Sequence, residues 1–116
     1  MITLYGISNC DTVKKARAWL IEHEQAYEFH DFKKSGVPPQ QLTHWVHAVG
    51  WEKLVNRQGT TWRKLSTEEQ AAAHDAPSAQ ALMLAHPSVI KRPVVNWGDG
   101  ITVGFDAPAW LNRTRR

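Results

Sequence analysis

Apolar residues near the start of the chain follow strand spacing first and helix spacing next. Residues 1–5 (MITLY) are a short β-forming run that stops at Gly6, which predicts a buried strand. Residues 27–32 (YEFHDF) alternate aromatic and polar side chains, as a half-buried strand does. Between them, from position 11 to about position 24, apolar side chains recur at helical spacing, at Val13, Ala16, Trp19 and Leu20. A strand, a helix and a strand in this order predict a right-handed βαβ unit with parallel strands.

The next part of the chain changes to a helical pattern. We expect a loop over residues 33–39 and then a helix that begins at Pro39, because proline is favourable at the first helical position. That helix is expected to run to Val49. Residues 51–65 predict a short helix, a break at Gly59 and a further helical turn.

Helical signals continue to about residue 86. Thr67 precedes two glutamates and an Ala-rich segment, so it is the expected cap of another helix. Residues 78–85 predict a further short helix, closed by a His-Pro pair. Together these elements indicate a helical insertion over about residues 39–86.

The end of the chain returns to strand patterns. Residues 94–96 and 101–103 predict two strands joined by a Gly-Asp-Gly turn at 98–100. A last helical turn is expected over 106–111, with Asp106 as its cap.

The order of these elements predicts an α/β, thioredoxin-like fold. A helical insertion separates the N-terminal βαβ unit from a C-terminal β-hairpin plus helix, and residues 1–116 are expected to form a single domain. Pro93, directly before a predicted strand, cannot donate a ladder hydrogen bond, and the Arg92–Pro93 bond is at a position where a cis peptide can occur.

Composition narrows the functional classes. The 116 residues contain one cysteine, so an internal disulfide and a cysteine-cluster zinc site are excluded. Fourteen basic and eleven acidic residues give a net charge of +3, too small an excess to predict nucleic-acid binding. No apolar run approaches the roughly 18 residues of a membrane span, and the N-terminus lacks signal-peptide features. We therefore expect a cytoplasmic protein that does not bind membranes.

Several other features have a plain structural explanation. His44 and His47 lie three apart on a predicted helix, but no third ligand is identifiable, so no metal site is predicted. Residues 113–116 are expected to form a solvated basic tail. We expect three tryptophans to pack in the core rather than to form an exposed surface on which a ligand stacks: Trp45, Trp51 and Trp62. A solvated face explains the basic residues Lys53, Arg57, Arg63 and Lys64 as well as attraction of an anion does.

Cys10 is the candidate for chemistry. It lies between the first strand and the first helix, where unpaired N–H groups and the helix dipole stabilise a thiolate. Lys14 and Lys15 are expected to add positive charge one turn later. The alternative is that Cys10 is an inert, buried apolar residue, but its polar neighbours favour a reactive thiol on a loop.

A single thiol also limits the mechanism. In a Cys-x-x-Cys pair the second cysteine resolves the mixed disulfide formed by the first, and here that position holds Val13. The resolving thiol must therefore come from another molecule. Glutathione is the expected co-substrate, with a glutaredoxin or a thiol/disulfide substrate protein as a further partner, and no bound cofactor is expected.

Three segments resemble the ArsC-like family, whose members include glutaredoxin-coupled arsenate reductases, Spx-type regulators that bind RNA polymerase, and YffB-type proteins. They are TLYGISNCDTVKKARAWL at residues 3–20, GTTWRKL at 59–65 and VIKRPVV at 89–95. The resemblance is best to the YffB-type branch. It implies a thioredoxin fold, a nucleophile matching Cys10, a cis proline matching Pro93 and an oxyanion-binding arginine matching Arg92.

The sequence also departs from the reductase pattern. Where the reductases have a His-Asn pair shortly before the cysteine, this chain has Gly6 and Ile7. The position of their second arginine is occupied by Asn56, with Arg57 adjacent, and the position of their third lies near Phe105. Losing such ligands weakens arsenate handling, since each charged hydrogen bond is worth about 1.5–3 kcal/mol. The resemblance thus favours a glutathione-dependent thiol reductase, with an Spx-type regulator or a weak arsenate reductase as alternatives.

The expected roles of the site residues follow. Cys10 attacks, and Thr12 with the amides after Cys10 stabilises the thiolate. Arg92, Arg57 and Asn9 are expected to bind the anionic partner, and Pro93 shapes the groove.

Overall fold

The structure, a computed structural model, describes residues 1–115 and divides into two compact units. The first unit contains Met1–Asp31 together with the segment from Arg92 onward, and the second contains Phe32–Lys91. The insertion expected over residues 39–86 thus lies within the second unit, which extends beyond it at both ends. Within residues 1–115, every helix is too short or too polar to cross a membrane.

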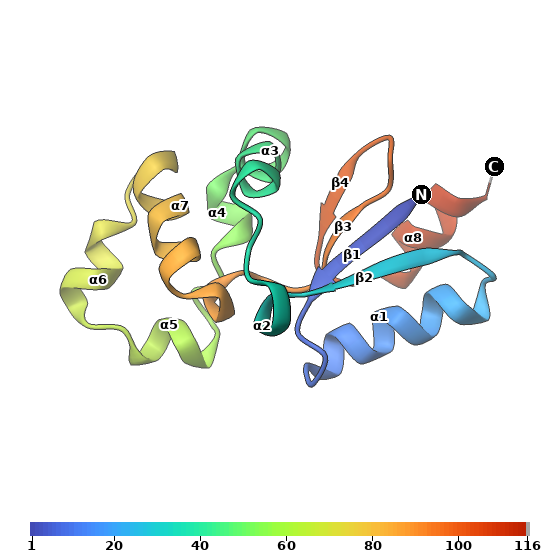
Figure 1. Cartoon of the computed structure of the whole chain (residues 1–116), viewed down its shortest axis with the longest axis horizontal. Helices are drawn as coiled ribbons and strands as arrows, with labels where there is room; N and C mark the ends of the chain where they lie inside the picture. Colours follow the sequence, from blue (N-terminus) through green and yellow to red (C-terminus); the bar gives the residue numbers. More distant parts are fainter. Residues whose placement is uncertain (116) are drawn as a thin grey trace. The chain divides into compact units, whose positions relative to one another are not determined.

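The first unit is built on a four-stranded mixed sheet in the order β2–β1–β3–β4 (Figure 1). Strand β1 (Ile2–Gly6) pairs in parallel with β2 (Tyr27–Asp31). On its other side β1 pairs antiparallel with β3 (Val94–Asn96), which pairs antiparallel with β4 (Ile101–Val103). Helix α1 (Asp11–Glu22) connects the two parallel strands, so the predicted βαβ unit is confirmed. The α/β, thioredoxin-like prediction is confirmed as well.

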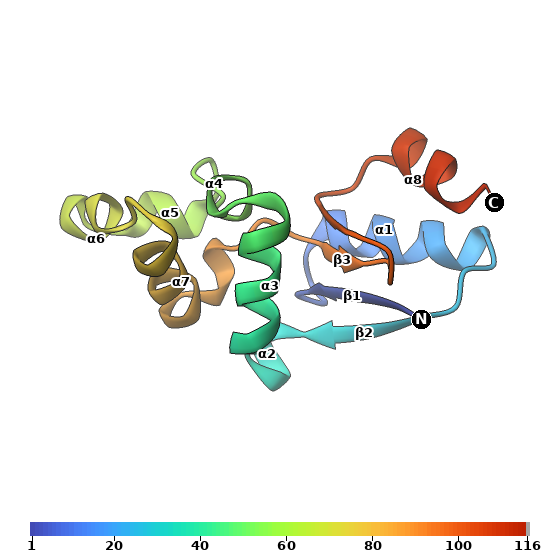
Figure 2. The same cartoon turned by 90° about the horizontal axis from the view of Figure 1, so that it is seen from above.

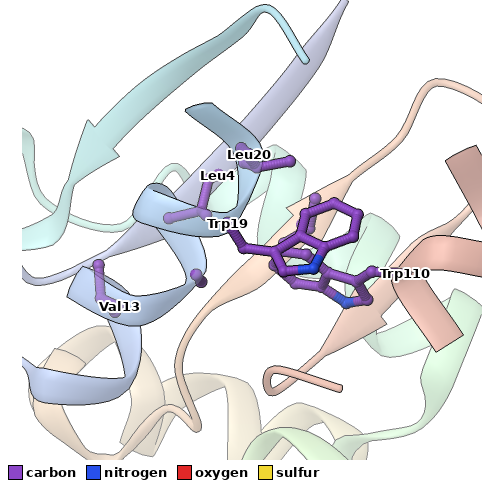
Figure 3. Close-up of a cluster of buried hydrophobic side chains, with 7 residues drawn as sticks. Leu4, Val13, Trp19, Leu20 and Trp110 are labelled. Atoms are coloured by element: carbon purple, nitrogen blue, oxygen red, sulfur yellow. The ribbon is translucent and has the colours of Figure 1, made fainter. Parts of the chain in front are cut away.

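Helices α1 and α8 (Ala107–Thr114) cover the same face of this sheet, as Figure 2 shows. Trp110 of α8 is 2% exposed and stands edge-on to three other aromatic rings. Its ring centroid lies 5.5 Å from that of Trp19, 5.0 Å from Trp97 and 4.8 Å from Phe105. Edge-to-face contacts of this kind add to the stabilisation from burial. The core residues, several of them drawn in Figure 3, are Leu4, Val13, Ala16, Trp19, Leu20, Val95 and Trp110.

Helix α8 begins as predicted and ends later than predicted. The carboxylate of Asp106 accepts the Ala109 N–H at 3.1 Å, which confirms the expected cap. The helix continues to Thr114, so the prediction that residues 113–116 form a solvated tail is wrong for Arg113. Nη1 of Arg113 donates to the Asp99 carboxylate at 2.8 Å. The Arg113 guanidinium also lies 5.5 Å from the centroid of the Trp97 ring. Arg116 lies outside the described residues.

The second unit is helical, as the pattern predicts, with a predicted helix at Pro39–Val49 confirmed at both ends. Leu42, Trp45, Leu54, Met83 and Ile90 are all fully buried. Its elements are α2 (Phe32–Ser35), α3 (Pro39–Val49), α4 (Trp51–Leu54), α5 (Thr60–Lys64), α6 (Thr67–Ala72), α7 (Ala76–Ala85) and a 3₁₀ turn, η1 (Pro87–Val89).

Three element boundaries in this unit correct the sequence prediction. The expected loop over 33–39 is partly helical, because strand β2 ends at Asp31 and the chain enters α2 at once. The cap of α6 is Ser66 and not Thr67, since the Ser66 hydroxyl accepts the Glu69 N–H and the Glu69 carboxylate accepts the Ser66 N–H. Helix α7 begins before residue 78, where Asp75 accepts the Ser78 N–H.

The tryptophans of the second unit differ from one another. Trp45 is fully buried, as expected. Trp51 and Trp62 are half-buried, and the Arg57 guanidinium lies 5.5 Å and 5.9 Å from their ring centroids. Cation–π contact therefore replaces the core burial predicted for these two rings. Arg57 itself is exposed.

Candidate active site

The candidate site is formed by the tight turn that joins β1 to α1 (Figure 1). The Cys10 N–H donates to the Ile7 carbonyl at 3.1 Å, so Ser8 and Asn9 form the exposed tip of this turn. Cys10 has extended backbone angles (φ −84°, ψ 126°) and is the N-cap of α1, and its carbonyl accepts the Lys14 N–H at 2.9 Å. The sequence therefore places a thiol where serine or aspartate usually caps a helix.

The Cys10 sulfur is half-buried and its pKa is lowered. Burial is the largest single influence and raises the pKa, because it disfavours the charged form. Three groups together outweigh the effect of burial and lower the pKa: the Val13 N–H, the Arg92 guanidinium and the Thr12 N–H. Thr12 and Val13 occupy the N2 and N3 positions, whose N–H groups have no partner inside the helix. The Cys10 side chain makes no capping hydrogen bond, and these N–H groups lower its pKa because they stabilise a negative charge placed at the start of the helix.

Arg92 reaches the sulfur from the other end of the sequence. It is half-buried and precedes Pro93 through a cis peptide bond, which confirms the expected isomer. The next residue, Val94, pairs with Tyr5 of β1, so the sheet holds Arg92 beside the end of the strand that leads to Cys10. Pro93 is buried, and its carbonyl accepts the Gly104 N–H at 2.8 Å. The guanidinium supplies both charge and hydrogen bonding to the thiolate.

The other residues singled out by the sequence are placed as follows. Thr12 acts through its backbone N–H, while its side chain is exposed. Asn9 is exposed in the turn, and Arg57 belongs to the second unit. Their roles in anion binding stay predictions. Lys14 and Lys15 are exposed and are not among the groups that lower the Cys10 pKa, because they point into solvent one turn beyond the sulfur.

Gly6 is the site residue whose role the sequence analysis missed. It ends β1, is buried, and lies against the side chain of Val13 in the first turn of α1. The sequence marks Gly6 as the end of a strand, but the closeness of strand and helix at this point is visible only in three dimensions.

Metal ligands do not gather around this thiol. Within residues 1–115, no group of three or more His, Cys, Asp or Glu side chains is arranged to hold a metal ion. His44 and His47 are both exposed on α3. Around Cys10 the structure places a partly accessible thiol, two backbone N–H groups and one guanidinium that lower its pKa, an arrangement that can activate a nucleophile.

Comparison with known proteins identifies the family. A YFFB protein of known structure is 47% identical and superimposes with a TM-score of 0.91, with 97% of each chain covered. An arsenate reductase (ArsC) related protein from Brucella melitensis is 45% identical, with a TM-score of 0.75 over 99% of this chain and 95% of that one. The global transcriptional regulator Spx of Streptococcus agalactiae is 28% identical over 91% of this chain and 77% of its own length. The model of the ArsC family matches residues 5–112, a span that contains Cys10, Arg92 and Pro93, and the chain therefore belongs to the ArsC family.

Proposed function

We propose that this protein is a glutathione-dependent thiol reductase with Cys10 as its nucleophile. One observation carries the proposal: the single cysteine is the N-cap of α1, where the first-turn N–H groups and the Arg92 guanidinium lower its pKa. A lowered pKa places more of the thiol in its nucleophilic form near neutral pH. With no second cysteine in the sequence, the resolving thiol has to be a separate molecule.

The proposed cycle has two exchange steps. In the first, the Cys10 thiolate attacks the glutathione sulfur of a mixed disulfide R–S–S–G, which forms a Cys10–S–S–G bond and expels R–S⁻ with the electron pair of the broken bond. R–S⁻ takes a proton from solvent. In the second step, a glutathione thiolate attacks the glutathione sulfur of the Cys10 adduct, releasing glutathione disulfide and the Cys10 thiolate. The net reaction is R–S–S–G plus GSH giving R–SH plus GSSG.

Arg92 is proposed to serve both steps. Its charge stabilises the Cys10 thiolate, which is the attacking group in the first step and the leaving group in the second. An arginine beside the sulfur also favours an anionic partner, and glutathione carries two carboxylates at pH 7. Arg57 and Asn9 remain candidates for the same task.

Turnover of a glutathione mixed disulfide tests the proposal. The mixed disulfide of glutathione and 2-mercaptoethanol is supplied with reduced glutathione, and glutathione disulfide is followed through NADPH consumption by glutathione reductase. We expect the wild type to turn over and Cys10→Ser to match the uncatalysed rate. Intact mass after incubation with glutathione disulfide should show one glutathione on the wild type and none on Cys10→Ser. Equal rates for the two proteins would overturn the proposal.

A second candidate is transcriptional regulation, favoured by the similarity to Spx across 91% of this chain. Its expected partner is RNA polymerase. In that case the Cys10→Ser variant should bind polymerase as well as the wild type does, because the chain lacks a Cys-x-x-Cys switch. Polymerase co-purifying with both proteins, with no glutathione adduct on the wild type, would support the regulator over the reductase.

Arsenate reduction is the third candidate, favoured by the similarity to the arsenate reductase related protein from Brucella melitensis. The Cys10 thiolate would attack arsenate, and Arg92 would hold the oxyanion. Arsenite production by the wild type with glutathione and a glutaredoxin, absent in Cys10→Ser, would support it. Catalysis with the mixed disulfide but not with arsenate would restrict the protein to thiol exchange.

A further inference from the structure

The end of β1 and the start of α1 are packed unusually closely at one point. A Cβ atom built on Gly6 would lie 2.7 Å from Cγ2 of Val13, 3.4 Å from its Cγ1 and 3.7 Å from its Cβ. The first of these separations is well inside van der Waals contact. We infer that Gly6 is a positioning residue of the Cys10 site: its missing side chain lets the first turn of α1, which carries the Thr12 and Val13 N–H groups, begin close to the end of β1 and to Cys10. This inference rests on the proposed function for its biological meaning.

Strand β1 is paired on both sides up to Tyr5, and Gly6 is paired with β2, so the sheet resists a movement of the strand that would relieve such a contact. Gly6 is in register with Asp31 of β2, and the residue before it, Tyr5, is in register with both His30 of β2 and Val94 of β3. Gly6 is not among the glycines with positive φ, so alanine can adopt its backbone conformation. A Gly6→Ala substitution therefore tests the space beside Gly6 and not the backbone angle.

The Val13 side chain cannot move aside either. It is fully buried in the core cluster, and β-branched residues in helices are held near one χ1 rotamer. Both of its methyl groups already lie within 3.4 Å of the position that the new Cβ would take, so rotation exchanges one contact for another. The displacement must therefore pass to the backbone of the first helical turn.

A displaced first turn changes the surroundings of the sulfur. Cys10 is held on the strand side of the turn by its N–H bond to the Ile7 carbonyl at 3.1 Å. The Cys10 carbonyl in turn accepts the Lys14 N–H of the helix at 2.9 Å, so a first turn displaced from the strand strains the link through Cys10 and changes the position of the Val13 N–H relative to the sulfur. That N–H is the first among the groups that lower the Cys10 pKa, and the electrostatics thus agree with the geometry.

Four variants test the inference through the Cys10 pKa, measured in the folded, full-length protein by thiolate absorbance and by alkylation rate against pH. We expect Gly6→Ala to raise the pKa by about one unit, a tenfold change in the thiol–thiolate equilibrium. Val13→Ala keeps the N–H and should leave the pKa at the wild-type value. The double variant Gly6→Ala/Val13→Ala removes the colliding methyl groups and should restore the wild-type pKa. Leu20→Ala disturbs the same core cluster away from the first turn and should not change the pKa.

Each outcome separates the inference from the proposed function. A lowered wild-type pKa that Gly6→Ala leaves unchanged would overturn the inference alone, as would an equal rise in the single and double variants. An ordinary pKa in the wild type would instead overturn the activated thiolate of the proposed function. Sucrose, which favours compact states, can be added for a weakly folded Gly6→Ala protein. A Gly6→Ala protein that remains unfolded in sucrose would also contradict the inference, because we expect the fold to tolerate a local shift of one helical turn.

Discussion

Removing the Arg92 guanidinium should raise the Cys10 pKa without moving the thiol. Arg92 contacts the sulfur both as hydrogen-bond donor and as charge, and methionine retains much of its length without either property. A hydrogen bond to a charged group contributes about 1.5–3 kcal/mol, and one pKa unit corresponds to about 1.4 kcal/mol. Because Cys10 is half-buried and solvent screens the pair, the lower end of that range applies. We therefore expect Arg92→Met to raise the pKa by about one unit.

Two assays measure this effect. Iodoacetamide alkylation against pH gives the pKa as the midpoint of the rate profile. Exchange with a neutral disulfide adds a second signature, because a more basic thiolate is more nucleophilic, with a Brønsted coefficient of about 0.5. The maximum rate constant at high pH should therefore rise about threefold in Arg92→Met, whereas at pH values well below both pKa values the rate should fall about threefold, because the tenfold smaller thiolate fraction outweighs the gain in nucleophilicity.

Matched variants define what would refute this reasoning. Arg92→Lys retains the charge but loses the planar fork, so its pKa should lie between those of the wild type and Arg92→Met. Arg17→Met removes a guanidinium on α1 that donates to the Tyr27 hydroxyl and lies over Phe29, and it should leave the Cys10 pKa unchanged. A wild-type pKa in Arg92→Met, or the same rise in Arg17→Met, would show that the guanidinium is not what stabilises the thiolate.

Three further predictions concern stability. Trp110→Ala should lower the free energy of unfolding by about 3–5 kcal/mol in urea titrations, whereas Leu111→Ala, at a partly exposed position of the same helix, should cost far less. Asp106→Ala should cost about 1 kcal/mol in the same assay, through loss of the cap on α8, and an unchanged urea midpoint would contradict that role. Hydrogen bonding from the Ser66 N–H and hydroxyl lowers the pKa of Glu69. The resulting stabilisation is present above the ordinary carboxyl pKa and is lost as pH falls through the lowered one, so the difference in thermal midpoint between wild type and Glu69→Ala should vanish in acid.

Local patterns explain most of what the sequence predicted correctly. The β1–α1–β2 unit follows from apolar spacing, and the position of Cys10 at the start of α1 follows from the boundary between two such patterns. The cis peptide at Pro93 was a hypothesis from a proline directly before a strand and was implied by the family resemblance, and the structure contains it. The ArsC family, recognised from three short segments, is confirmed by a family match over residues 5–112.

What the sequence did not predict depends on contacts between distant residues or on fine spacing. Arg113 pairs with Asp99 across the end of the β3–β4 hairpin, which no local pattern indicates, and so it was taken for part of a tail. Helix α2 was missed because the alternation of β2 continues into Phe32 without a break signal. The close approach of Gly6 to Val13 leaves no room for a side chain, since a Cβ built on Gly6 would lie 2.7 Å from Cγ2 of Val13, and no pattern of residue types carries that information.

The pKa of Cys10 in the wild-type protein tests the central claim most directly. Alkylation by iodoacetamide, followed by intact mass across a series of pH values, reports on Cys10 alone because the sequence contains one cysteine. The donors at the start of α1 and the Arg92 guanidinium predict an apparent pKa below that of a free cysteine, which is about 8.5. A midpoint at or above that value would mean that burial prevails, and Cys10 would then be an ordinary thiol with no special reactivity.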